Sequence, residues 1–275
     1  MTSLFLLGLV LLLLALRQNI ITILIVIVAS TILLYSEEQL YFMTEHMWRS
    51  LNNEVLLSIP LFILCGSIMT NGAISVRLIN VMRTATCALP GGLGATCILS
   101  CAFFAAISGS SMVTLLAVGT ILYPALRKEG YSQQYSLGAI TSAGTLGVII
   151  PPSIPLIVYG ISTQTSITDL FIAGIIPGLL LTVALLGYSL FKNRKLPKYP
   201  FNPREFFTAV KDGIWSLLMP FILLGGIYSG YFTATESAAV ALCYALVIEL
   251  FVYKETKLVN LKKMVIETSQ LVGTL

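Results

Sequence analysis

The sequence predicts an all-α polytopic membrane protein with one re-entrant helical hairpin and one broken helix. Of its 275 residues, 57% are hydrophobic and only 10% are charged, and the mean hydropathy is +0.92. That composition leaves too little polar surface to cover a soluble globule of this size. Apolar runs long enough to span about 30 Å of hydrocarbon recur along the chain. The apolar run Ser142–Gly160 holds Pro151, Pro152 and Pro155, which a continuous helix cannot accommodate.

Hydropathy and charge together predict seven helical segments, the fourth of which is broken. They cover residues 1–16, 20–35, 54–71, 134–161, 170–191, 213–231 and 237–253. The first is interpreted as a transmembrane helix. A signal peptide is the less favoured alternative, because no basic segment precedes the run and no small-residue cleavage site precedes Arg17.

The apolar stretch 89–126 is interpreted as a re-entrant hairpin. It lies between Arg83 and the basic pair Arg127 and Lys128, and the polar residues Ser108–Ser111 interrupt its middle. A hairpin keeps both basic ends on one side of the membrane. With the N-terminus outside, every lysine and arginine except Arg49 then falls on the cytoplasmic side, as the positive-inside rule requires.

Two amphipathic stretches are expected outside the spans. Pro203–Lys211 has apolar residues at helical spacing beside charged neighbours, which predicts a helix in the inner interface within a connecting arm, residues 193–212. Thr44–Leu51 contains Trp48 and is expected to lie in the outer interface.

The two interruptions are the candidate binding elements. Sodium takes hard oxygen ligands, and a transporter must also release it, so neutral carbonyls and hydroxyls suit it. The hairpin tip, Ile107–Ser111, offers three hydroxyls around a glycine, and the broken helix offers oxygens before its prolines. The expected sodium-binding residues are Ser108, Gly109, Ser110, Gly144, Thr145 and Gly147.

An anionic group is expected beside the cation. The second half-helix begins near Ser153, and its free amides would face that group. The expected substrate-binding residues are Ser111, Pro152 and Ser153. The structural alternative is that glycine and serine only allow close helix packing and that the prolines only kink a helix.

Other polar residues are weaker candidates. Glu249 interrupts an apolar run, but it lies about one turn from Lys254 and the inner boundary, so snorkelling or pairing is favoured over function. Glu236 follows Thr233 at a predicted helix start, where a capping role is favoured. The sequence contains no nucleophile elbow, HExxH pair or phosphate-binding glycine loop, so we do not expect an enzyme.

Seven segments carry a family resemblance. They are Ile59–Ser75, Leu89–Thr96, Ile107–Ser111, Pro124–Tyr131, Gly144–Gly160, Leu170–Leu181 and Phe232–Ala241. In this order they resemble the large membrane subunit of tripartite ATP-independent periplasmic (TRAP) transporters, the DctM-like permeases. The resemblance implies an ion-transporter-superfamily fold and sodium-coupled import of small organic acids such as sialic acid or dicarboxylates. It further implies a small TRAP membrane subunit and a periplasmic substrate-binding protein as partners in a bacterial inner membrane, where the N-terminus that the charges place outside would be periplasmic.

The resemblance also implies a domain organisation. Residues 1–192 would form a first repeat with scaffold helices within 1–84, the hairpin 89–126, the broken helix 134–161 and the helix 170–191; residues 213–275 would begin a second repeat. Family members are considerably longer, so we expect the chain to be incomplete alone, either truncated or paired with a complementary second-repeat chain. Two alternatives stay open: a carboxylate permease of the same superfamily that needs no binding protein, and a non-transporting scaffold subunit.

Overall fold

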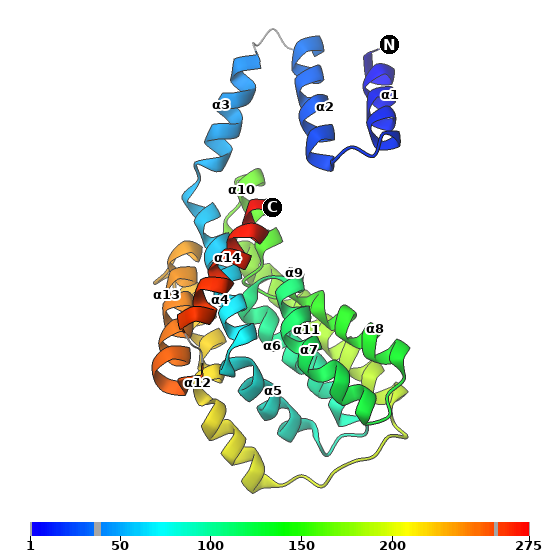
Figure 1. Ribbon diagram of the computed structural model, residues 1–275, viewed down its shortest axis with the longest axis vertical. Helices are drawn as coiled ribbons and strands as arrows, with labels where there is room; N and C mark the ends of the chain where they lie inside the picture. Colours follow the sequence, from blue (N-terminus) through cyan, green and yellow to red (C-terminus); the bar gives the residue numbers. More distant parts are fainter. Residues whose placement is uncertain (1, 36–39, 256–257, 275) are drawn as a thin grey trace. The chain divides into compact units, whose positions relative to one another are not determined.

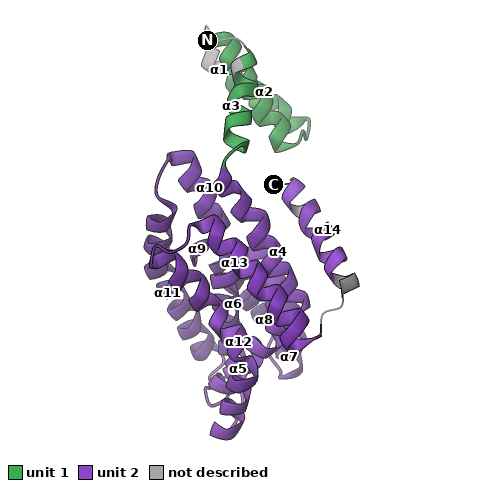
Figure 2. Cartoon of the chain, turned by 90° about the vertical axis from the view of Figure 1, so that its left-hand side faces the viewer, with its two compact units in different colours: residues 1–53 green, residues 54–275 purple. Residues whose placement is uncertain are grey.

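The computed structural model describes residues 2–35, 40–255 and 258–274, and within these ranges the chain forms helices and no strand (Figure 1). The chain divides into two compact units, Met1–Asn53 and Glu54–Leu275 (Figure 2). Each unit is described by itself below.

The first unit contains two apolar helices and one amphipathic helix. They are α1 (Thr2–Ala15), α2 (Ile20–Tyr35) and α3 (Leu40–Leu51). The first two match the helices predicted at 1–16 and 20–35. In α3, an exposed ion pair joins Arg49 to Glu45 at 2.6 Å, and Trp48 is exposed. The location of this helix in the outer interface stays a prediction.

The second unit contains the remaining helices. They are η1 (Glu54–Leu57), α4 (Ser58–Asn71), α5 (Ala73–Thr86), α6 (Gly92–Ser108), α7 (Ser111–Lys128), α8 (Gln133–Gly144), α9 (Leu146–Ile149), α10 (Ile154–Thr163), α11 (Ile167–Lys192), α12 (Pro203–Tyr228), α13 (Ala234–Val247), η2 (Ile248–Tyr253) and α14 (Leu258–Thr274). The centre of this unit is α6, which contacts α4, α5, α7, α8, α9, α11 and α12. Phe104 and Ile107 of α6 are fully buried, so the helix that leads to the hairpin tip is held by the core.

Five segments of the second unit are long and apolar enough to cross a membrane, counting the described residues. They are Glu54–Asn71, Gln133–Thr163, Ile167–Lys192, Pro203–Tyr228 and Ala234–Tyr253. Three further helices of the described residues are apolar but shorter: Phe5–Ala15 and Ile20–Leu34 in the first unit, and Gly92–Ser108 in the second. These findings confirm the all-α polytopic membrane fold.

The structure corrects the predicted boundary between the connecting arm and the helix 213–231. Residues Pro203–Tyr228 form one continuous helix, α12, so the amphipathic stretch is its first part. Asn202 caps this helix by accepting a hydrogen bond from the Arg204 amide, and Pro203 occupies its first turn, where a missing amide costs nothing. Gly213 is a helix-weakening residue at the expected boundary. A Cβ built on it would lie 2.9 Å from the Val81 side chain of α5. Close packing of α12 on α5 therefore keeps this position helical.

The acidic residues Glu236 and Glu249 have different environments in the structure. Glu236 forms a capping box with Thr233, whose amide donates to the carboxylate at 2.8 Å, which confirms the predicted cap. Glu249, by contrast, is fully buried, so of the two expected alternatives, snorkelling and pairing, snorkelling is wrong. Its carboxylate turns inward onto the first amides of α5, where it accepts hydrogen bonds instead of reaching the membrane boundary.

Candidate functional site

The hairpin tip is a tight turn between α6 and α7. Gly109 adopts a left-handed backbone conformation with φ 61°, and its amide donates to the carbonyl of Ala105 at 3.2 Å. Residues with a side chain rarely adopt this conformation, so the glycine is what allows the chain to reverse here. Ser110 is extended, and α7 begins directly at Ser111.

The broken helix has three parts. Its first half, α8, ends at Gly144, and a single turn, α9, follows before the chain becomes non-helical at the prolines. The second half, α10, begins at Ile154 with Pro155 in its first turn. We call the stretch Gly144–Ile154, which ends at the first residue of α10, the helix break.

The hairpin tip and the helix break contact each other through their backbones. The Ile154 amide donates to the Gly109 carbonyl at 3.0 Å. A Cβ built on Gly147 would lie 2.8 Å from the carbonyl oxygen of Ser110, and one on Gly109 would lie 2.7 Å from the carbonyl oxygen of Pro152. Both separations are shorter than a real Cβ contact, so two glycines permit the approach.

Three hydroxyls of the site form hydrogen bonds with nearby hydroxyl or carbonyl groups. Ser108 is fully buried, and its Oγ lies 3.0 Å from the Thr114 hydroxyl. The exposed Thr145 hydroxyl donates to the Ser142 carbonyl at 2.7 Å, and the buried Ser153 hydroxyl donates to the Val148 carbonyl. A hydroxyl that donates a hydrogen bond retains lone pairs that a cation can bind.

The structure therefore places all nine predicted residues at two chain segments that touch. Six are the expected sodium-binding residues and three are the expected substrate-binding residues. The oxygens that these residues carry are neutral hydroxyls and carbonyls, a type of ligand that suits a weakly held monovalent cation.

Sequence reasoning missed two residues that shape the site. Thr114 pairs with Ser108 and lies one helical turn after Ser110, whose carbonyl accepts from its amide at 3.1 Å, so helical spacing could have found it. Gly66 of α4 packs against the tip: a Cβ built on it would lie 3.0 Å from Cβ of Ser108 and 2.8 Å from the Val113 side chain. No sequence signal pairs Gly66 with the tip, because this contact is long-range.

The other end of the hairpin is fixed by two tyrosines. The Tyr131 hydroxyl accepts from the Gly94 amide at 3.1 Å, and the Tyr135 hydroxyl lies 2.6 Å from the Ser189 hydroxyl of α11. The two rings stack with centroids 5.5 Å apart. These contacts tie α6 to α8 and α11, so the hairpin and the broken helix are joined at both ends.

Comparison with known proteins identifies the family. Residues 7–275 match the family described as "Tripartite ATP-independent periplasmic transporter, DctM component". A C4-dicarboxylate TRAP transporter large permease protein from Pseudomonas aeruginosa is 41% identical over 88% of this chain and 58% of its own length. An isethionate TRAP transporter permease protein from Oleidesulfovibrio alaskensis is 41% identical over 78% of this chain and 34% of its own.

A third relative has a different named substrate. The sialic acid TRAP transporter permease protein of Haemophilus influenzae is 37% identical over 84% of this chain and 38% of its own length. The chain thus spans 34% to 58% of the length of these three curated relatives. Since the family match covers nearly the whole chain, the chain belongs to the DctM family of TRAP transporter large permeases.

Proposed function

We propose that this chain is a membrane permease subunit that binds Na⁺ between the hairpin tip and the helix break and couples that binding to import of small organic acids. The carrying observation is the backbone contact of the tip and the break, where the Ile154 amide reaches the Gly109 carbonyl at 3.0 Å. This contact brings together the two segments that carry the six expected sodium-binding residues. Coupling follows if the ion and the substrate share this contact, because occupancy by one then favours the arrangement that binds the other.

The proposed substrate class is a small organic acid. The three relatives are named for transport of C4-dicarboxylates, isethionate and sialic acid. In this chain the first amide of α10, that of Ile154, donates to the Gly109 carbonyl, and Pro155 carries no amide hydrogen. We therefore assign the anionic group mainly to the Ser111 hydroxyl and the positive dipole end of α10, beside Pro152 and Ser153.

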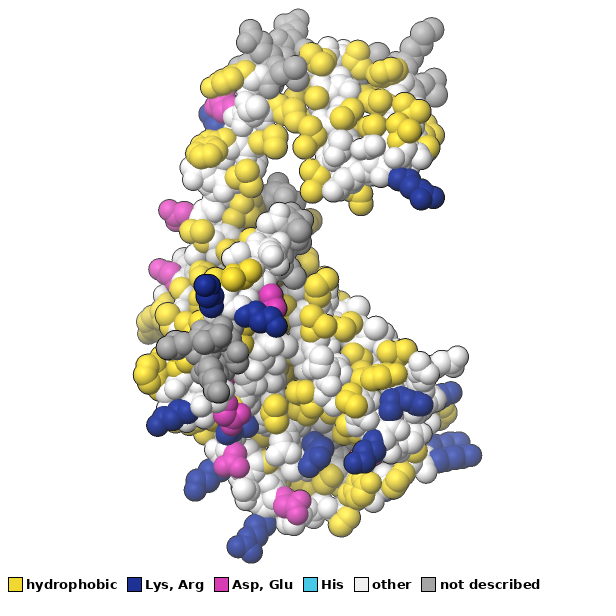
Figure 3. Space-filling view, in the orientation of Figure 1, with side chains coloured by type: hydrophobic (Ala, Val, Ile, Leu, Met, Phe, Trp, Pro, Cys, Tyr) yellow, Lys and Arg dark blue, Asp and Glu magenta, His cyan; other side chains and the backbone are white. Residues whose placement is uncertain are grey.

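The proposed partners are a small TRAP membrane subunit, a periplasmic substrate-binding protein and the lipid bilayer. The charge distribution supports a bacterial inner-membrane location with the cytoplasmic side at the basic end of unit 2. Figure 3 shows most Lys and Arg side chains of this face in the lower half of that unit. Arg83 near the end of α5, Lys128 at the end of α7 and Arg204 at the start of α12 are exposed, as the positive-inside rule expects.

Thermal unfolding of the purified chain in detergent tests the sodium site. Unfolding is measured in NaCl and in KCl or choline chloride at matched ionic strength. Sodium at 100 times its Kd should stabilise the folded state by about 2.7 kcal/mol, because a ligand that binds only that state shifts the equilibrium by mass action.

Two double variants make the test specific. Ser110→Ala with Thr145→Ala removes two of the proposed oxygens and should abolish the sodium-dependent shift. Thr141→Ala with Ser162→Ala is the matched control, because both hydroxyls are exposed and bond only within their own helices. Equal stabilisation by potassium, or an unchanged sodium shift in the first double variant, would contradict the proposed site.

A further inference from the structure

The chain bends sharply between α4 and α5 at a segment we call the elbow, Asn71–Ala73. Gly72 is extended there, with φ −102° and ψ −173°, and no side chain of the elbow caps the helix that follows. The first amides of a helix have no partner within the helix and must find one elsewhere when buried. Ala73 and Ile74 are both buried.

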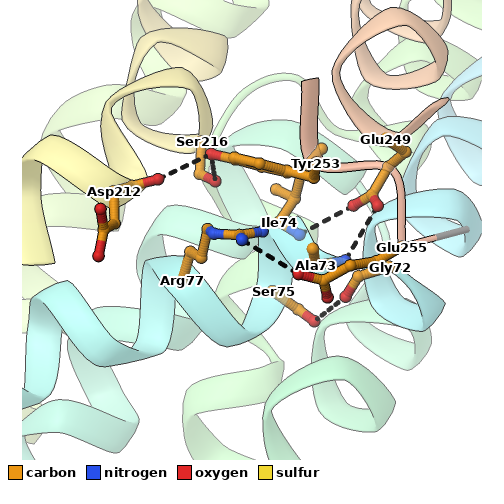
Figure 4. A network of polar contacts seen from close by, with 10 residues as sticks. All are labelled: Gly72, Ala73, Ile74, Ser75, Arg77, Asp212, Ser216, Glu249, Tyr253 and Glu255. Atoms are coloured by element: carbon orange, nitrogen blue, oxygen red, sulfur yellow. Dashed lines mark hydrogen bonds and ion pairs between the residues drawn. The ribbon is translucent and has the colours of Figure 1, made fainter. Parts of the chain in front are cut away.

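The cap for α5 comes from a residue far along the chain. Glu249 accepts a hydrogen bond from the Ala73 amide at 3.0 Å and another from the Ile74 amide at 2.8 Å (Figure 4). Its side chain is fully buried, so the two amides and the positive end of the α5 dipole help offset the cost of burying a carboxylate. A Cβ built on Gly72 would lie 2.1 Å from the Glu249 carboxylate, so only glycine leaves room for it.

The turn that carries Glu249 is a π-helix, η2, which follows directly on α13. A wider turn of this kind changes the direction in which side chains leave the helix, and such turns are often found at functional positions. In this turn Glu249 faces the elbow, while Tyr253 lies over α5 and reaches α12 (Figure 4).

A second set of contacts surrounds the capped helix end. The Arg77 guanidinium lies 3.7 Å from the centre of the Tyr253 ring and pairs with Glu255 at 3.0 Å. The Tyr253 hydroxyl lies 3.2 Å from the Ser216 hydroxyl and donates to the Asp212 carbonyl. The start of α5 is thus tied to both η2 and α12.

The elbow is connected to the hairpin tip through α4. Gly66 lies six residues before Gly72, which corresponds to about 9 Å along a helix. A Cβ built on Gly66 would lie 3.0 Å from the Cβ of Ser108, so the two segments have no room to move closer. The angle at which α4 meets the elbow therefore fixes the position of the α4 surface that the tip contacts.

We propose that Glu249 is a positioning residue for the hairpin tip: its buried carboxylate sets the elbow, and the elbow sets α4 against Ser108. The inference rests on the proposed function only in treating that tip as the cation site. The Glu249 side chain itself makes no contact with the proposed ion. Its effect is carried by the packed backbone of α4.

Amide hydrogen exchange of the full chain in detergent tests this directly. Glu249→Gln keeps the shape of the side chain but weakens the acceptor, and exchange should accelerate both at residues 72–77 and at the tip, residues 108–114. The expected acceleration at the tip is about threefold or more, within the range seen for coupled sites. Residues 177–186 of α11 serve as the internal reference for global opening.

Glu255→Gln is the matched control, because it removes an exposed carboxylate from the same network without touching the elbow amides. Acceleration confined to residues 72–77 would overturn the inference, since Glu249 would then be a local cap only. Equal acceleration in the α11 reference would overturn it as well. Sodium titration of the unsubstituted chain is run in parallel, so that a failure of the sodium site is seen separately from a failure of this coupling.

Discussion

Adding one methyl group at Gly147 should separate the hairpin tip from the helix break. A Cβ at this position would lie 2.8 Å from three backbone atoms, the carbonyl carbon and oxygen of Ser110 and the amide nitrogen of Ser111. Backbone atoms cannot rotate away as a flexible side chain can. Gly147→Ala therefore requires the tip to move by several tenths of an ångström.

The free-energy cost of overpacking at Gly147 can be measured separately by comparison with a second glycine of the same broken helix. Overpacking of this kind costs about 1–3 kcal/mol, while alanine gains up to about 1 kcal/mol over glycine in a helix. At Gly138, in α8, a built Cβ meets nothing within 4 Å. Gly138→Ala should therefore show the gain alone, and the difference between the two variants should equal the overpacking cost.

Thermal unfolding in detergent measures the difference, and about 2–4 °C per kcal/mol is expected for a domain of this size. Gly147→Ala should thus unfold about 2–12 °C below Gly138→Ala, with a weaker sodium-dependent shift because the Ser110 carbonyl has moved. If both variants raise the unfolding temperature equally, the close approach of tip and break is wrong and the proposed site loses its carrying observation.

Three further experiments test other contacts of the second unit. Gly72→Ala should lower the free energy of unfolding by about 3 kcal/mol or more, because it displaces the buried Glu249 carboxylate from its amides; an unchanged unfolding temperature would contradict that geometry. Thr233→Ala should cost about 1 kcal/mol in the same assay by removing the capping box of α13, and Thr233→Ser should restore it. A double-mutant cycle with Ser108→Ala and Thr114→Ala, measured by denaturant unfolding, should give a coupling energy of about 0.5–1.5 kcal/mol for their buried hydrogen bond, whereas strict additivity would mean that the bond contributes nothing.

The helices and the two interruptions could be predicted from the sequence because they follow from local chemistry. Long apolar runs allow only helices at membrane depth, and Pro151 and Pro152 remove the donors that a continuous helix needs. A glycine among hydroxyls marked the hairpin tip, and Gly109 does adopt the left-handed conformation that a reversal requires.

The features that could not be predicted depend on contacts between distant segments. Nothing local shows that Gly66 packs on Ser108, or that α12 continues through Gly213 because that residue packs on α5. Glu249 was misjudged for the same reason. Its distance from Lys254 suggested the membrane boundary, whereas a π-turn and the space left by Gly72 direct it to α5.

The chain thus separates its charged and neutral oxygens by task. Under the proposed function, the tip and the break offer hydroxyls and carbonyls, whose weak hold would let an ion leave as readily as it enters. The buried carboxylate of Glu249 is satisfied by the amides of α5 at 2.8 and 3.0 Å, away from the tip. A carboxylate at the tip itself would bind a cation more tightly and slow its release, because removing one partner of a buried ion pair is costly. Under the proposed function, a carboxylate is better placed where nothing needs to be released, and Glu249 lies at such a place, because at the elbow it holds only the first amides of α5.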